Sequence, residues 1–224
     1  MAIRVHRGLL VVLQTIMVAE LAALLSESQW LNGILVLTIM ALTLAPVMLG
    51  HRLPIKIPPE FQILTIVFVF ASLFLGNVRS YYDRIWWWDI GLHASSGLLF
   101  GILGFLLVYV LNENERVDIH LRPRFVALFA FVFAVTVGAL WEIFEFGMDQ
   151  VFGTQMQKPS VGDPSGLTDT MWDLIVDTMG ALAISALGWL GTIRGKWFFI
   201  EGWIQGFITD NRQPFRKSKR EPTP

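Results

Sequence analysis

The sequence predicts an all-α fold, a polytopic membrane helix bundle with about six transmembrane helices. The 224-residue chain is 54% hydrophobic and only 16% charged, a composition typical of proteins that cross a membrane several times. Its apolar stretches approach the roughly 20 residues that a helix needs to span a bilayer. Its basic residues cluster in alternate connections between those stretches, as expected beside the cytoplasmic ends of spans.

The predicted spans follow one another with short connections. They are residues 8–25, 31–49, 61–77, 90–111, 125–146 and 171–193. The first lacks the small-residue cleavage site of a signal peptide, so we expect it to be retained as a span. The third is short enough to lie partly in the membrane interface. Residues 1–195 are therefore predicted to form one six-span membrane domain.

The residues after the last span are expected to stay on the cytoplasmic side. Residues 196–209 mix aromatic side chains with Lys196 and Glu201, which favours an amphipathic helix lying in the interface. Residues 210–224 are basic and predicted to be disordered. This tail either attracts anionic lipid or simply keeps the end of the chain in the cytoplasm.

The distribution of charge sets the orientation. With the N-terminus in the cytoplasm, only Arg79, Arg84 and Lys158 of the 17 basic residues fall on the outer side. Both termini are therefore predicted to be cytoplasmic, in a multi-pass protein of the bacterial inner membrane. The outer side then receives most of the 18 acidic residues, namely Glu20, Glu27, Asp83, Asp89, Glu142, Glu145, Asp149, Asp163, Asp169, Asp173 and Asp177.

Three acidic clusters lie at the outer ends of the last three spans. In chain order they are Asp89 with His93, Glu142 with Glu145 and Asp149, and Asp169 with Asp173 and Asp177. A charge inside a bilayer costs at least about 2.5 kcal/mol on insertion scales, so such residues are functional by default. Because these consecutive spans alternate in direction, we expect the clusters to converge on one outward-facing site.

Some of these residues also have a structural interpretation. Asp89 and Asp169 stand at helix starts, where an aspartate is often an N-cap, and His93 could hydrogen-bond to Asp89. Capping does not explain Asp173 and Asp177, which lie deeper in the span. Three carboxylates at four-residue spacing repel one another unless a cation or protons intervene.

Glu142 and Glu145 are three residues apart in an aromatic-rich run, and Asp149 follows on about the same helix face. They either line the site or pair with Arg79 or Arg84 as structural links between helices. The connection that follows, residues 147–169, is rich in glycine and proline and is expected to be a lid.

The residue types indicate a metal site. Carboxylate oxygens suit Mg²⁺, Mn²⁺ or Ca²⁺, and an added imidazole admits zinc or iron, so the identity of the ion stays open. The predicted metal ligands are Asp89, His93, Glu142, Glu145, Asp173 and Asp177. The predicted catalytic residues are His93, Glu142, Glu145, Asp173 and Asp177.

Several other chemistries are excluded. The sequence has no cysteine, hence no disulfide, thiolate metal site or cysteine nucleophile. It also lacks a glycine-rich phosphate loop, a Gly-x-Ser-x-Gly elbow and an HExxH motif. It offers no folded basic face for nucleic acid. The expected partners are the lipid bilayer and a lipid or lipid-linked substrate.

At these residues the chain resembles the uncharacterised bacterial inner-membrane family typified by YjdF and, more distantly, the VanZ-like membrane proteins. The shared features are Asp89-x3-His93 followed by Gly97, Glu142-x2-Glu145, Gly153-Thr154-Gln155, and Asp169-Thr170-x2-Asp173 leading to Gly180-Ala181. The resemblance covers roughly residues 60–195. One departure is the stretch from Lys158 to Gly166, which looks inserted. The resemblance implies a membrane fold with a site at these residues and points to the cell envelope.

The function predicted from the sequence is that of a divalent-cation-dependent membrane enzyme acting on an envelope lipid or lipid-linked intermediate. Two alternatives stay open: a cation-binding transporter or permease, and a non-catalytic structural membrane subunit. A transporter should carry ionisable groups past the membrane midplane, and the inner halves of the fourth and sixth spans are apolar. The substrate and the oligomeric state are not predicted.

Overall fold

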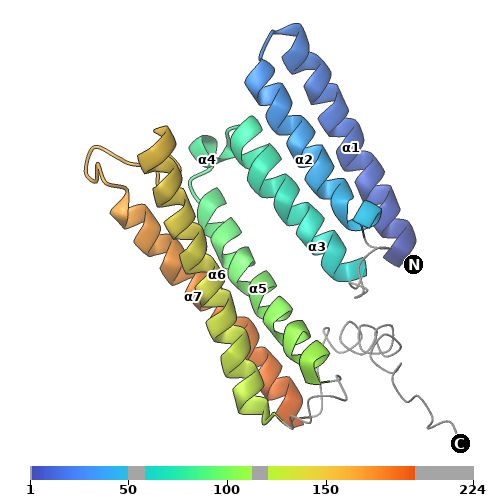
Figure 1. Cartoon of the computed structure of the whole chain (residues 1–224), viewed down its shortest axis with the longest axis vertical. Helices are drawn as coiled ribbons and strands as arrows, with labels where there is room; N and C mark the ends of the chain where they lie inside the picture. The colour runs from blue at the N-terminus through green and yellow to red at the C-terminus, as the bar shows by residue number, and fades with distance from the viewer. Residues whose placement is uncertain (1, 50–58, 113–120, 195–224) are drawn as a thin grey trace, which may run out of the picture. The chain divides into compact units, whose positions relative to one another are not determined.

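The computed structural model describes residues 2–49, 59–112 and 121–194, and the regular elements in these ranges are all helices (Figure 1). Within these ranges, six helical segments are long and apolar enough to cross a membrane. The predicted fold class is therefore confirmed. The predicted interfacial helix at 196–209 and the tail at 210–224 lie outside the described residues.

The described residues divide into two compact units. Unit 1 ends at Trp88, and unit 2 begins at Asp89. Each unit contributes three of the six membrane-crossing segments. The single six-span domain predicted for residues 1–195 stays a prediction.

Unit 1 contains α1 (Ala2–Ser26), α2 (Trp30–Leu49), α3 (Pro59–Val69), the π-helical segment η1 (Phe70–Val78) and the short α4 (Tyr81–Arg84). The third predicted span is thus α3 continued by η1, which together are 20 residues long and sufficient to cross a bilayer. The wider turns of η1 show in its last hydrogen bond, from the Arg79 N–H to the Phe74 carbonyl five residues earlier at 3.0 Å.

The core of unit 1 consists of large apolar side chains: Leu10, Leu13, Met17, Leu24, Val36, Ile39, Ile66, Phe70 and Phe74. Polar side chains of this unit form pairs between its helices, although Nε2 of the buried His6 lacks a hydrogen-bond partner in the described residues. The Gln14 side chain donates to the Thr43 hydroxyl at 2.8 Å, and Arg79 pairs with Glu20 at 3.0 Å. Arg79 therefore has a carboxylate partner within unit 1, and the alternative that Arg79 or Arg84 pairs with Glu142 or Glu145 stays a prediction.

Unit 2 contains α5 (Trp88–Asn112), α6 (Pro123–Phe152) and α7 (Leu167–Arg194), which run in alternating directions (Figure 1). Helices α6 and α7 are longer than the predicted spans at 125–146 and 171–193. The connection predicted at 147–169 therefore shortens to residues 153–166. Its prediction failed at the edges because carboxylates lower the hydropathy at the outer ends of these helices without ending them.

Small residues let the helices of unit 2 approach closely. A β-carbon added at Gly180 on α7 would lie 2.5 Å from the Ala94 carbonyl oxygen of α5. One added at Gly104 on α5 would lie 2.8 Å from the Ala130 Cα of α6. Small residues thus allow close backbone contact between these helices, as in other helix pairs within membranes. They hold the three helices close enough for their polar side chains to meet.

Candidate functional site: an acidic cluster around His93

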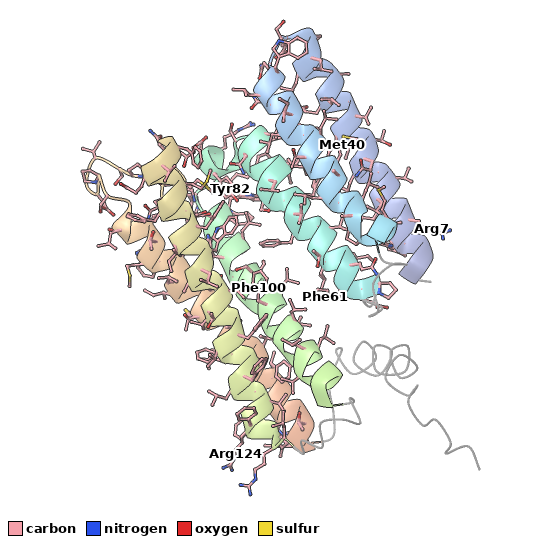
Figure 2. The ribbon with its side chains drawn as sticks, in the orientation of Figure 1. Arg7, Met40, Phe61, Tyr82, Phe100 and Arg124 are labelled. Carbon is pink, nitrogen blue, oxygen red and sulfur yellow. The ribbon has the colours of Figure 1, made fainter. Side chains whose placement is uncertain are left out.

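The three predicted acidic clusters converge at one end of unit 2. The starts of α5 and α7 and the end of α6 lie at this end, beside the connection 153–166 (Figure 1). The opposite end carries the basic residue Arg124, near the start of α6 (Figure 2). Asp177 lies ten residues into α7, which places it about 15 Å along the helix from its first residue.

His93 lies at the centre of the cluster and faces four carboxylates from three helices. Its Nε2 lies 3.6 Å from an oxygen of Asp173 and 3.8 Å from an oxygen of Asp89. Its Nδ1 lies 3.3 Å from Asp177 and 3.9 Å from Glu142. The imidazole is buried, with 8% of the residue exposed. One ring therefore links α5, α6 and α7.

Asp177 is the most completely held of these carboxylates. Its second oxygen accepts a hydrogen bond from the Ser96 hydroxyl of α5. Gly138 on α6 makes room for it, because a β-carbon at that position would lie 2.7 Å from Asp177 Oδ2. Ser96 and Gly138 were not identified from the sequence, since neither residue type stands out in an apolar helix.

Glu142 is buried without a hydrogen-bond partner. Only 4% of the residue is exposed, and neither carboxylate oxygen has a partner of acceptable geometry among the described residues, although the Thr170 side chain lies nearby. A buried carboxylate normally accepts several hydrogen bonds, because leaving one unsatisfied is costly. Neither Glu142 oxygen is satisfied in this way within the described residues.

Glu145, one turn nearer the end of α6, is also buried but has a partner. The Trp141 indole N–H donates to Glu145 Oε1 at 2.9 Å, and 44% of Trp141 is exposed on the outside of the unit. A lipid-facing aromatic side chain thus contacts a carboxylate beside the cluster. The indole pairing, like the position of Ser96, depends on helix rotation and could not be read from spacing alone.

The connection 153–166 supplies a cation that was not predicted as part of the site. The Lys158 ammonium forms an ion pair with Asp89 Oδ2, and it also lies near Asp169 and Asp173. Burial lowers the pKa of Lys158, but the Asp89 carboxylate outweighs it and raises the pKa overall. Lys158 has a positive φ of 42°, a backbone conformation that residues other than glycine rarely adopt.

Hydrogen bonds organise this connection. The Asp149 carboxylate accepts hydrogen bonds from the Thr154 hydroxyl at 2.5 Å and from the backbone N–H groups of Met156 and Gln157 at 2.8 and 3.0 Å. The buried Gln157 side chain donates to the Thr170 hydroxyl of α7 at 2.9 Å. Asp149 therefore shapes the loop and does not line the cluster, although spacing grouped it with Glu142.

A second aspartate caps α7 from the loop. Asp163 Oδ2 accepts from the Thr168 N–H at 2.5 Å, and the Ser165 hydroxyl donates to Asp163 Oδ1 at 2.6 Å. These hydrogen bonds, that from Ser165 first, lower the pKa of the Asp163 carboxyl to about 2. Asp169 was expected as the N-cap, but it lies inside the first turn of α7, where its Oδ2 is buried without a partner.

Asp89 is likewise not a cap. It is the second residue of α5, and its two oxygens face His93 and Lys158. Ligand atoms of Asp89, His93 and Asp173 all lie within 4.8 Å of one another, a spacing that could hold a metal ion. Of the other predicted ligands, Glu142 and Asp177 lie on the Nδ1 side of the His93 ring, and Glu145 lies one turn further along α6. Carboxylate oxygens with one imidazole form the donor set of a divalent cation.

The chain belongs to the family described as "Predicted membrane protein (DUF2238)", which matches residues 5–194. It is 29% identical over 132 residues to a protein of Thermotoga maritima described as "Uncharacterized protein". That match covers 59% of this chain and 63% of the relative, so the chain spans less than two thirds of that protein. No solved structure matches the chain. The resemblance to the YjdF and VanZ-like families stays a prediction.

Proposed function

We propose that this protein binds a divalent metal ion at the cluster around His93 and uses it in a reaction on a lipid or lipid-linked substrate. The reaction would take place at the outer face of the bacterial inner membrane. Glu142 is the observation that carries the proposal, since both of its oxygens are buried without a hydrogen-bond partner in the described part of the chain. A cation bound at the other nitrogen of the His93 ring would offset the negative charge that Glu142 brings to the cluster.

The residues divide into two groups around this site. Asp89, His93 and Asp173 would hold the ion, which when bound would polarise a substrate oxygen or a water molecule. Glu142 and Asp177 add negative charge from the other side of the imidazole. They would stabilise the positive charge of the ion and keep the His93 ring oriented. Glu145 would be the acid or base nearest the lipid-facing surface, through its contact with Trp141.

The location of the cluster favours a substrate that reaches it from the bilayer. Trp141, Phe144 and Trp172 expose their side chains on the outside of α6 and α7 at the level of the acidic residues. These surfaces suit lipid chains, and the polar part of an amphipathic substrate would then lie at the depth of the cluster. A phosphate group there would depend on the metal ion, because the nearest ammonium, that of Lys158, is already paired with Asp89.

The transporter alternative is less well supported. Beyond Asp177, α7 contains no ionisable side chain before Arg194, and α5 contains none between His93 and Tyr109. An ion path through unit 2 would therefore lack ionisable side chains over about half of the bilayer. A cluster confined to one end of the three helices fits an enzyme or a binding protein better than a permease.

The metal is tested first. The full-length protein, purified in detergent and incubated with Mn²⁺, should retain one equivalent by elemental analysis after desalting. Glu142→Gln should lose at least about tenfold in Mn²⁺ affinity, and Glu27→Gln, which changes an exposed glutamate of unit 1, should bind like the wild type. Absence of Mn²⁺ from the folded wild type, or equal affinity in Glu142→Gln, would contradict a metal site.

The reaction and the orientation need separate tests. Lipid mass spectrometry should show a species that accumulates in a deletion strain and returns to normal with the wild-type gene but not with Asp173→Asn. An unchanged lipid profile would leave a binding protein and argue against an enzyme. A reporter fused at residue 160 should report the periplasm, and a cytoplasmic signal would overturn the outward-facing site.

A further inference from the structure

Lys158 stands out in unit 2 because its ammonium already occupies part of the acidic cluster. It is paired with Asp89 Oδ2, while Oδ1 of the same carboxylate faces His93 Nε2 at 3.8 Å. Asp89 thus belongs both to the metal-binding group and to the ion pair with the loop. Any cation bound between Asp89, His93 and Asp173 would lie close to the lysine ammonium.

The backbone of Lys158 adopts a conformation that is unfavourable for a lysine. Its φ of 42° lies in the left-handed region, where the β-carbon of a lysine crowds the backbone. The preceding residue, Gln157, is fixed by its hydrogen bonds to Asp149 and Thr170 at 3.0 and 2.9 Å. Its backbone and Cβ also pack so closely against Gly166 that no side chain fits there. These contacts keep the less favourable backbone conformation of Lys158 in place.

We propose that Lys158 is the resident cation of the site and that a divalent cation displaces it from Asp89, which releases residues 153–166 from the cluster. The inference rests on the proposed metal site and adds a competitor to it. Two cations a few ångströms apart in a low-dielectric site repel strongly. The tethered ammonium stabilises the carboxylates while the ion is absent, and it opposes binding of the ion.

A second observation supports a ligand at this place independently of the acidic cluster itself. Glu142 is 4% exposed, and its oxygens have no hydrogen-bond partner in the described ranges. It lies on the Nδ1 side of His93, whereas the Lys158 ammonium is paired with Asp89, which faces Nε2. Glu142 and Asp177 thus face the Nδ1 edge of the ring and fix its orientation, and the Nε2 edge, where Lys158 is paired with Asp89, is the edge left for an incoming cation.

The first experiment measures Mn²⁺ affinity of the full-length protein by electron paramagnetic resonance. Lys158→Met should bind Mn²⁺ at least tenfold more tightly than the wild type, because it removes the competing charge. Lys158→Arg keeps the charge and should stay within threefold of the wild type. Arg84→Met, which removes an exposed basic residue of unit 1, is the matched control and should not change the affinity. Lys158→Gln provides a second neutral variant if Lys158→Met does not fold.

The second experiment follows the loop by hydrogen–deuterium exchange. In the wild type, Mn²⁺ should increase exchange at least threefold in peptides covering 153–166, while peptides of α1 and α2 stay unchanged. In Lys158→Met the same peptides should already exchange fast without Mn²⁺. A loop that becomes more protected when Mn²⁺ binds would overturn the inference.

The outcomes separate this inference from the proposed function. If the wild type binds Mn²⁺ and the neutral variants bind it equally or more weakly, Lys158 does not compete, and the metal site stands. If neither the wild type nor any variant binds Mn²⁺, the metal site and the inference both fail. Tighter binding by the neutral variants without any change in loop exchange would also overturn the proposed release.

Discussion

The two units of this protein differ in how their polar side chains are paired. Unit 1 pairs Gln14 with Thr43 and Glu20 with Arg79, and Nε2 of its buried His6 lacks a partner in the described residues. Unit 2 gathers carboxylates from three helices around His93, with Lys158 as the added cation. Balanced pairs only hold helices together. Buried charge that is not balanced by a partner is costly in a membrane, and for this reason the proposed function is placed in unit 2.

The largest expected effect comes from separating the helices of unit 2. Gly180→Leu would force α7 away from the Ala94 carbonyl of α5, because even a β-carbon would lie 2.5 Å from that oxygen. We expect a loss of about 3 kcal/mol in stability and loss of Mn²⁺ binding. Gly8→Leu in unit 1 should be tolerated, since a β-carbon there meets nothing within 4 Å. Denaturant titration with a Mn²⁺ binding assay measures both, and an equal response of the two variants would remove the contrast.

The second effect separates charge from folding. Asp173→Asn removes one carboxylate beside His93, so Mn²⁺ affinity should fall at least about tenfold while the ion-free protein is as stable as the wild type or more so. Glu20→Gln in unit 1 should instead cost up to about 1 kcal/mol of stability through Arg79 and leave Mn²⁺ binding unchanged. If Asp173→Asn unfolds the protein and the wild type binds no metal, the network around His93 is structural.

The sequence predicted the arrangement of the site better than its details. Apolar length gave the six spans, and alternating span direction brought Asp89, Glu142 and Asp173 to one end of unit 2. The ends of α6 and α7 were missed because the same carboxylates that mark the site lower the local hydropathy.

Contacts that depend on the geometry of the loop could not be predicted from the sequence. Lys158 stands in a stretch rich in glycine and proline, and nothing in its spacing indicates that it reaches Asp89. Asp149 has the spacing of a site residue, but the chain turns after Gly153 and directs the backbone N–H groups of Met156 and Gln157 to it. Hydropathy and periodicity describe helices, and they do not describe where a turn sends a side chain.

A smaller effect tests the balanced pairs of unit 1. Thr43→Val removes the oxygen that accepts a hydrogen bond from Gln14, at a residue that is 1% exposed. We expect a loss of about 0.5–1.5 kcal/mol in stability, measured by denaturant titration, with Mn²⁺ affinity within error of the wild type. A change in Mn²⁺ affinity would show that the polar contacts of unit 1 serve the site after all.

The smallest effect concerns the acid response of the loop. The pKa of Asp163 is lowered to about 2 by the Ser165 hydroxyl and the Thr168 N–H. Its contribution to loop stability should therefore be complete above about pH 4, the value for an unperturbed aspartate, and be lost as the pH falls through about 2. An NMR titration of the carboxyl carbon should show this midpoint, and Ser165→Ala should raise it. A normal midpoint in the wild type would mean that these hydrogen bonds do not persist in solution.

The measurement that tests the metal site most directly is pulsed electron paramagnetic resonance of Mn²⁺ bound to the full-length protein. The chain has four histidines, and of the two that the structure describes, His6 and His93, only His93 lies in the acidic cluster. The wild type should show coupling of Mn²⁺ to one imidazole nitrogen, His6→Gln should keep that coupling, and His93→Gln should lose it. Bound Mn²⁺ without nitrogen coupling, or coupling that survives in His93→Gln, would contradict a metal site built around His93.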